Sequence, residues 1–163
     1  MSNLLYLQQK IMTPDKAAHT VLGWKLKSAR IGFTNGCFDL LHVGHLHTLM
    51  HTADHSDKVV VGINSDASVS RLKGASRPLV SQEQRALLLA AFLFVDAVVI
   101  FEQDTPLELI GLLLPDLLVK GGDWAEKDIV GADLVRQSGG DVQVVPYLTG
   151  WSTTELAHKM AQL

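Results

Sequence analysis

The sequence predicts an α/β fold in which a doubly wound, parallel, five-stranded sheet carries helices on both faces. Short apolar runs rich in β-branched residues alternate along the chain with segments of helical character, which favours parallel strands covered on both sides. Polar segments follow these strands, and ligands of such sheets bind beyond the carboxyl ends. The length of 163 residues suits one domain. We therefore expect a single Rossmann-like domain over residues 30–163, preceded by an N-terminal helical extension over residues 1–29.

Each strand is predicted from an apolar run that ends in polar or glycine-containing sequence. The five expected strands are 31–33, 58–63, 97–101, 116–119 and 142–145. Helices are expected to begin at residue 42 and at residue 152, and to cover 81–94, 104–113 and 132–138. Ser81-Gln82-Glu83-Gln84 matches a capping box at the start of one of them. Residues 64–78 are expected to form a polar loop.

The N-terminal extension is expected to be helical and to pack on the domain. Thr13, Pro14 and Asp15 suit the N-cap, the first position and the first turn of a helix that runs to about Ser28. Residues 1–10 are expected to form a short helix. This extension carries no evident chemistry.

The stretch from Ile31 to His47 indicates a phosphate site. A short strand leads into a polar, glycine-containing turn, and a helix then carries His42-Val43-Gly44-His45 in its first turn. The first backbone N–H groups of a helix have no partner inside the helix, so they can bind an anion. His42 and His45 are three residues apart and lie on one face. Gly44 has no Cβ and allows a ligand to approach the backbone.

Composition and missing motifs exclude several classes of protein. The net charge of −3 argues against a general nucleic-acid binder, and a single cysteine allows no internal disulfide. The N-terminus shows no signal peptide, and the longest apolar run is too short to span a membrane. We therefore expect a cytoplasmic protein without nucleic-acid or membrane partners. Neither GxxxxGK[ST] nor a GxGxxG after a strand occurs, which disfavours P-loop kinases and dinucleotide dehydrogenases.

The segment TNGCFDLLHVGH resembles the signature of the HxGH nucleotidylyltransferase superfamily. One branch of it is similar over residues 30–160, through the segments VGINSDASVSRLKG, RPLVSQEQR, DTPLELI, PDLLVKGGDW and WSTTEL. That branch makes ADP-heptose from ATP and D-glycero-β-D-manno-heptose 1-phosphate. The resemblance implies that a sugar 1-phosphate attacks the α-phosphorus of ATP and that pyrophosphate leaves. Such transfer relies on positioning and charge stabilisation, without a protein nucleophile.

The resemblance also implies roles for individual residues. His42, His45 and Lys73 would stabilise the reacting phosphates. The residues expected to bind nucleotide or phosphate are Thr34, Asn35, Gly36, Phe38, Gly44, Arg77, Arg85, Lys120, Gly121, Asp123, Trp124, Ser152, Thr153 and Thr154. Asp39, Asn64 and Asp66 would contact the sugar phosphate or orient other groups. The expected partners are ATP with Mg²⁺, which needs few protein ligands, a sugar 1-phosphate, and a second copy of the chain in a homodimer.

Other interpretations remain open from the sequence. Lys73 and Arg77 could be solvated charges, Arg85 could pair with Glu83, and the acidic candidates could be caps or turn residues. His42, His45, His47 and His51 crowd one helix near Cys37, which suggests a metal protein as a second class. A nucleotide-sensing module without turnover is a third. Within the enzymes, the alternative is a cytidylyltransferase acting on glycerol 3-phosphate or a similar alcohol phosphate.

Overall fold

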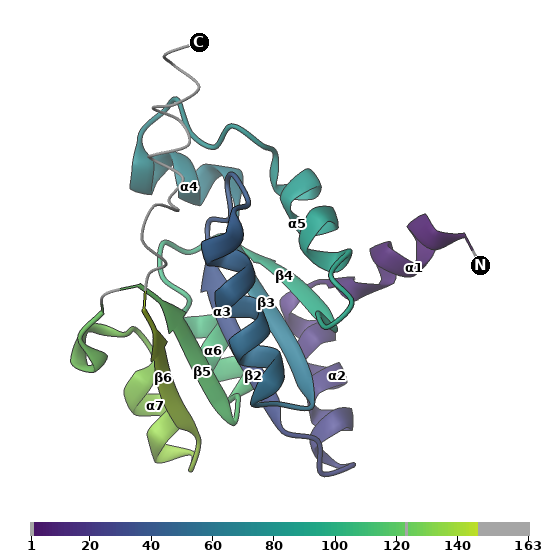
Figure 1. Ribbon diagram of the computed structural model, residues 1–163, viewed down its shortest axis with the longest axis vertical. Helices are drawn as coiled ribbons and strands as arrows, with labels where there is room; N and C mark the ends of the chain where they lie inside the picture. The colour runs from purple at the N-terminus through teal and green to yellow at the C-terminus, as the bar shows by residue number, and fades with distance from the viewer. Residues whose placement is uncertain (1, 123, 147–163) are drawn as a thin grey trace.

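The computed structural model describes residues 2–122 and 124–146, and the sheet in this part of the chain has six parallel strands (Figure 1). The strands are β1 (Ile11–Met12), β2 (Ile31–Gly36), β3 (Lys58–Asn64), β4 (Ala97–Phe101), β5 (Leu117–Gly121) and β6 (Asp141–Val145). Their order is β1-β4-β3-β2-β5-β6. The strand order reverses at β2, because β3 and β4 lie on one side of it and β5 and β6 on the other. The predicted doubly wound α/β fold is confirmed.

Helices cover both faces of this sheet. They are α1 (Asn3–Lys10), α2 (Pro14–Lys25), α3 (Val43–Asp54), α4 (Asp66–Lys73), α5 (Gln82–Ala90), α6 (Leu107–Leu113) and α7 (Ala132–Gln137), with the short 3-10 helix η1 (Glu126–Asp128). Val21 of α2, Leu109 of α6 and Val135 of α7 share one hydrophobic cluster. Leu49 of α3 and Leu89 of α5 belong to a second cluster on the opposite face, and α3 crosses in front of the sheet in Figure 1.

The apolar strand β3 shows why the sheet is covered on both sides. Val60 belongs to the first cluster, whereas Val59, Val61 and Ile63 belong to the second. All four side chains are at most 1% exposed. Side chains alternate between the faces of a strand, and burying each of these contributes about 1.5–3 kcal/mol. The continuous apolar run is therefore the signature of a central strand with two buried faces.

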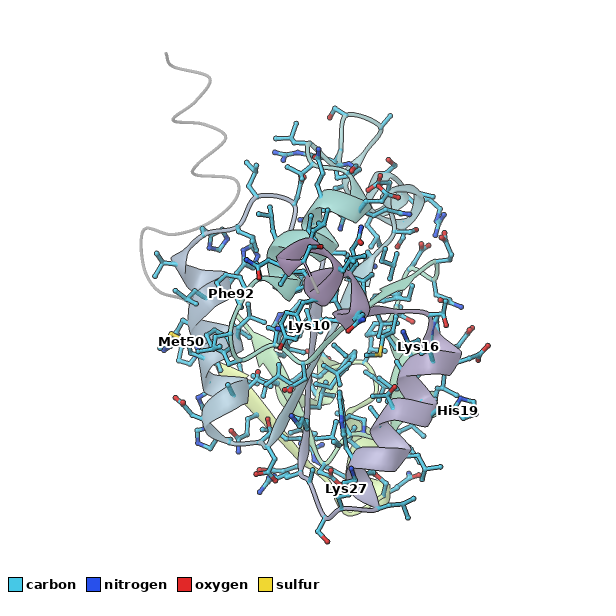
Figure 2. All side chains as sticks on the ribbon, turned by 90° about the vertical axis from the view of Figure 1, so that its right-hand side faces the viewer. Lys10, Lys16, His19, Lys27, Met50 and Phe92 are labelled. Carbon is cyan, nitrogen blue, oxygen red and sulfur yellow. The ribbon has the colours of Figure 1, made fainter. Side chains whose placement is uncertain are left out.

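The N-terminal extension adds a strand that the sequence analysis did not predict. Ile11 and Met12 pair in parallel with Val98 and Val99 of β4 at the edge of the sheet. Two residues are too few to show a hydrophobic period, so the pattern of the chain could not reveal this strand. Lys10 donates to the carbonyl oxygens at the C-terminal end of α5, at 3.1 and 3.3 Å, and so ties α1 to the body (Figure 2). The domain boundary at residue 30 stays a prediction.

Residues 64–78 were expected to be a polar loop, and this expectation is wrong for their first half. Helix α4 begins after Ser65, whose hydroxyl accepts the backbone N–H of Ser68. Its buried residues are only Ser68 and Val69, so the apolar period that identifies most helices is missing. The helix ends at Gly74, whose φ of 98° favours glycine. Lys73 is therefore the last residue of a helix.

Of two predicted helix starts, one is confirmed and the other differs in detail from the structure. Thr13 is the N-cap of α2 and accepts the N–H of Lys16, as expected. Ser81 is the N-cap of α5, but its side chain makes no capping bond, and α5 ends at Ala90 instead of Phe94. The helix predicted from residue 152 lies outside the described residues.

Gly32 lies where α3 packs closely on β2, and we expect an alanine there to be destabilising. A Cβ on Gly32 would lie 2.7 Å from Thr52 Cγ2 and would also meet the hydroxyl of Ser56. Overpacking of this kind costs about 1–3 kcal/mol of stability. Gly23 in α2 is the matched control, since a Cβ there meets nothing within 4 Å in the described part of the chain. Gly23→Ala should raise stability by about 0.5–1 kcal/mol.

Urea unfolding of both glycine variants checks this prediction. The midpoint should fall for Gly32→Ala and rise for Gly23→Ala, with similar slopes. A shift of both midpoints in one direction would mean that the close packing between α3 and β2 does not limit the size of residue 32.

Candidate active site

A cavity of about 540 Å³ lies at the carboxyl ends of β2, β3, β5 and β6, beside the N-terminus of α3. Most of the predicted site residues line it: Thr34, Asn35, Gly36, Phe38, His42, Gly44, His45, Asn64, Lys73, Lys120, Gly121 and Trp124. The cavity spans the point at which the strand order reverses, where ligands of open parallel sheets bind. A more open cavity of about 510 Å³ lies at the amino ends of β2, β5 and β6, and none of these residues line it.

The two histidines of the HxGH segment form a stacked pair at the wall of the cavity. His42 is the N-cap of α3, and His45 follows in its first turn. Their ring centroids are 3.8 Å apart with an interplanar angle of 26°. Phe38 packs on the other side of His45, with 5.0 Å between the centroids. The i, i+3 spacing on a helix brings the two rings together, and Phe38 limits how far they can move.

Both imidazoles are neutral in the free protein. Burial lowers the pKa of His42 below its usual value. Burial, together with the neighbouring His42 and Lys73, lowers the pKa of His45 from 6.5 to about 3. A neutral imidazole has one N–H donor and one acceptor nitrogen. Each ring can therefore donate one hydrogen bond to an anion, while its other nitrogen accepts one.

The Nδ1 atoms of His42 and His45 are buried and have no hydrogen-bond partner among the described residues. Buried polar atoms in native proteins are almost always paired, so an unpaired one marks a place where a ligand or water belongs. The side chain of His42 makes no capping bond to α3. The backbone N–H of His45 bonds to the carbonyl oxygen of His42, and among the described residues the N–H groups of Val43 and Gly44 remain available to an anion at the cavity.

Lys120 contributes a half-buried amine at the end of β5. Its amine lies 3.4 Å from Asn35 Oδ1 and 5.4 Å from the ring centre of Trp124. Burial lowers the pKa of Lys120, although the neighbouring Cys37 acts in the opposite direction. The described residues supply no carboxylate to pair with it. A partly desolvated amine in this position is stabilised by a bound anion such as a phosphate group.

Lys73 reaches the cavity from the C-terminal end of α4. The helix is held at this place by Arg71, which pairs with Asp104 at 2.7 Å after β4. Lys73 itself is exposed. The short helix therefore presents an exposed cation at the rim of the cavity, on the side of β3 and β4.

Four predicted site residues do not line the cavity. Arg85 is fully buried, and Asp39 is 3% exposed. Arg77 donates to Asp39 at 2.7 Å, and Arg85 donates to Asp66 at 2.7 Å. Their guanidinium groups bind protein carboxylates, so a contact of Arg77 or Arg85 with the nucleotide stays a prediction. Asp123, Ser152, Thr153 and Thr154 lie outside the described residues.

Several cavity residues were missed by the sequence analysis: Cys37, Thr48, Leu72, Asp104, Thr105, Pro106, Gly122, Asp128, Ile129, Val130, Val145 and Pro146. Some could have been found from the rule already used for Asn64 and Lys120. Asp104 follows strand β4, and Val145 ends β6, so both lie at the carboxyl edge. Thr48 is one turn beyond His45 on the same helix face. Residues 128–130 carry no comparable signal.

The remaining histidines of α3 are separate from the cavity pair. His51 Nε2 lies 2.7 Å from Gln143 Oε1, and its ring stacks on His55 at a centroid distance of 4.3 Å. His51 is therefore a half-buried residue that bonds to strand β6. In the described part of the chain, no three histidine, cysteine or acidic side chains are grouped as metal ligands would be. Nor does that part contain a helix with the length and apolar character needed to cross a bilayer.

Comparison with known families shows to which family the chain belongs. The model of the cytidylyltransferase-like family matches residues 33–155, which include the stacked histidines and most of the cavity. This chain belongs to the cytidylyltransferase-like family. The matched range also contains strands β3 to β6 and their helices, so the family resemblance extends through the sheet that carries the cavity.

Curated relatives agree with this membership. The chain is 51% identical over 152 residues to the bifunctional protein HldE of Koribacter versatilis, and 51% identical over 153 residues to that of Paramagnetospirillum magneticum. These matches cover 93% and 94% of the chain but 31% of each relative. The chain thus spans about a third of the length of these relatives. The superfamily resemblance inferred from the sequence is confirmed.

Two solved structures share the fold. A lipopolysaccharide core biosynthesis protein from Thermoplasma volcanium has a TM-score of 0.57 at 22% identity, covering 74% of this chain and 97% of that one. Pantoate-beta-alanine ligase from Francisella tularensis has a TM-score of 0.60 at 17% identity, covering 94% and 78%. At these identities the likeness shows the common α/β architecture alone.

Proposed function

We propose that this chain is a nucleotidylyltransferase that transfers AMP from ATP to a sugar 1-phosphate, with D-glycero-β-D-manno-heptose 1-phosphate as the acceptor. The observation that carries the proposal is the stacked pair of His42 and His45, neutral and with unpaired buried nitrogens, at a helix N-terminus in the cavity. The family membership and the HldE relatives support the same reaction class. The choice of heptose rests on the sequence resemblance.

In the proposed reaction an oxygen of the sugar 1-phosphate forms a bond to the α-phosphorus of ATP. The bond from that phosphorus to the bridging oxygen breaks, and pyrophosphate leaves with the electron pair. Charge on the phosphate oxygens increases and shifts as the phosphorus becomes crowded. His42 and His45 would donate hydrogen bonds there, and Lys73 and Lys120 would supply positive charge. Fixed donors in a partly closed cavity stabilise this charge better than mobile water does.

The topology suggests which half of the cavity takes each substrate. Lys120 and Trp124 lie on the side of β5 and β6, where a cation and an aromatic ring suit a nucleotide. Asn64, Lys73 and Thr105 lie on the side of β3 and β4. Amide and hydroxyl groups pair with sugar hydroxyls, and a lysine on this side can pair with the acceptor phosphate as it joins the α-phosphate. The α-phosphate would then lie between the halves, beside the histidines.

Mg²⁺ is proposed as the companion of ATP. Such an ion takes most of its ligands from water and phosphate and needs only one or two protein carboxylates. Asp128 lines the cavity on the side of Lys120 and Trp124 and would supply such a ligand, whereas Asp104 is already paired with Arg71. When bound, the ion neutralises phosphate charge and so supplements the positive charge of the two lysines.

A second candidate is favoured by the name of the matching family. A cytidylyltransferase acting on glycerol 3-phosphate or a similar alcohol phosphate would use the same histidines and the same attack on an α-phosphorus. The difference lies in the base and in the acceptor. The cytoplasmic setting and the homodimer stay predictions of the sequence.

We expect ATP to exceed CTP in kcat/KM by at least ~10²-fold, which corresponds to about 2.7 kcal/mol. A pocket that hydrogen-bonds one base leaves its polar groups unpaired with another base, and this penalty is larger than that of a loose fit. The measurement is pyrophosphate release with each nucleotide and, as acceptors, the heptose 1-phosphate, a second sugar 1-phosphate and glycerol 3-phosphate.

The same panel separates the alternatives. Preference for CTP with glycerol 3-phosphate would establish the second candidate. Binding of ATP without pyrophosphate release from any pair would favour a nucleotide sensor. Tightly bound, stoichiometric zinc in the purified protein, together with absent turnover, would favour the metal-binding class.

A further inference from the structure

Arg85 is a buried charge that the proposed chemistry does not use. Its side chain is fully buried in α5, and it is not part of the cavity wall. A buried guanidinium is tolerated only when its N–H groups are paired. Its Nε donates to the carbonyl oxygen of Val80 at 3.0 Å, its Nη1 to that of Cys37 at 2.5 Å, and its Nη2 to Asp66 Oδ1 at 2.7 Å.

These three partners belong to three segments that shape the cavity. Cys37 lies in the loop between β2 and α3, directly before the histidine pair, and lines the cavity. Asp66 is the first residue of α4, the helix that ends at Lys73. Val80 lies in the segment that leads into α5. One planar group therefore connects the loop that carries the imidazoles to the helix that carries the rim lysine.

Neighbouring bonds make these connections more rigid. Gln82 Oε1 accepts the backbone N–H of Asp66 at 2.8 Å, so α5 holds both the backbone and the carboxylate at the start of α4. Asp39, two residues after Cys37, accepts bonds from Arg77 and from the N–H groups of Leu79 and Val80. Burial alone would raise the pKa of Asp39, but these bonds outweigh it and keep the pKa below its usual value.

We propose that Arg85 is a positioning residue that sets the distance between the histidine pair and Lys73. It contacts no substrate and acts through the Cys37 carbonyl on one side and through Asp66 and α4 on the other. The proposal rests on the proposed function for its kinetic consequence. The histidines and the lysine must reach one phosphate group together in the transition state. Loss of the Arg85 bonds should displace these groups relative to one another, and so lower kcat more than it weakens ground-state binding.

Arg85→Lys is the main variant, because it keeps the positive charge but cannot bind all three partners in one plane. Val98→Ala is the matched control. Val98 is fully buried in β4 and belongs to the same hydrophobic cluster as α5, but it does not line the cavity. Both variants are compared with the wild type by urea unfolding, and kcat and KM for ATP are measured where each protein is folded.

We expect Arg85→Lys to lower kcat by at least about 10-fold with little change in KM, since small displacements of catalytic groups are costly. Val98→Ala should lose stability but keep its kcat. A folded Arg85→Lys protein with the kcat of the wild type would overturn the proposal. If Arg85→Lys does not fold, Asp66→Ala replaces it, because this carboxylate is 40% exposed and its loss removes only one of the three anchors. An unchanged kcat in Asp66→Ala would equally overturn the proposal.

A readout without turnover separates this proposal from the proposed function. The ring ¹⁵N–¹H NMR signals of His42 and His45 report the surroundings of the stacked pair. They should shift in Arg85→Lys and stay in place in Val98→Ala. If the histidine signals shift in Arg85→Lys but the wild-type protein releases no pyrophosphate, the positioning role of Arg85 stands and the proposed enzymatic function is rejected. Unshifted signals in Arg85→Lys would reject the positioning role, whatever the activity.

Discussion

Replacing His42 or His45 with alanine should lower kcat ~10²- to 10³-fold, which is the effect of removing one fixed donor from a site of developing negative charge. The two rings stack at 3.8 Å beside the first turn of α3, and both are neutral donors at neutral pH. Their hydrogen bonds should strengthen as charge grows on the α-phosphate. The KM for ATP should therefore change much less than kcat.

A third histidine of the same helix provides the control. His51 lies two turns further along α3 and bonds to Gln143 outside the cavity. His51→Ala should keep the kcat of the wild type, even where some stability is lost. Pyrophosphate release in single-turnover and steady-state assays measures the effect. Near-normal turnover in both cavity variants would remove the histidine pair from the mechanism.

The burial of His45 has a consequence for stability that needs no substrate. Its pKa is lowered from 6.5 to about 3 by burial, then by His42 and Lys73, so the unfolded chain binds a proton that the folded protein does not. The stability that this group contributes is complete above pH 6.5 and is lost as the pH falls toward 3. When the pH is lowered from about 7 to about 5, the free energy of unfolding of His45→Gln should therefore fall less than that of the wild type, as measured by urea unfolding.

Lys73→Ala should fold normally but lower kcat ~10²- to 10³-fold, since it removes a whole charge from the transferring phosphate. Lys73 is exposed at the C-terminal end of α4, so its removal leaves no cavity and no unpaired buried group. It also lies close enough to His45 to lower the pKa of that imidazole. The lysine and the histidines can therefore act on one phosphate group.

Two further variants test whether charge at this place matters. Lys73→Arg keeps the charge and should retain more kcat than Lys73→Ala. Lys27→Ala removes an exposed lysine beyond the end of α2, labelled at the lower end of the molecule in Figure 2; it does not line the cavity, so the change should leave kcat and Tm as they are. Thermal melting and pyrophosphate release are measured together. A large drop in Tm with intact activity in Lys73→Ala would show that the residue is structural.

The local sequence pattern was sufficient to predict the histidine pair, which is the central part of the site. A β-branched run predicts β3, and the spacing of His42 and His45 places both rings on one face at a helix start. These features depend on the period of a strand and of a helix, which act over a few residues. The carboxyl-end rule then brought Asn64 and Lys120 to the same edge, since parallel strands end together.

Contacts between distant segments decided the rest. Arg85 appears in the sequence as one more charged residue of a helix, and only packing shows that it is buried against the carbonyl of Cys37. Helix α4 has too few apolar positions to be recognised, and its bonds to residues 102–104 hold it in place. The strand at Ile11 forms because an edge of β4 is available to it. In each case the stabilising partner is far away in the chain, so no local period of side chains could reveal it.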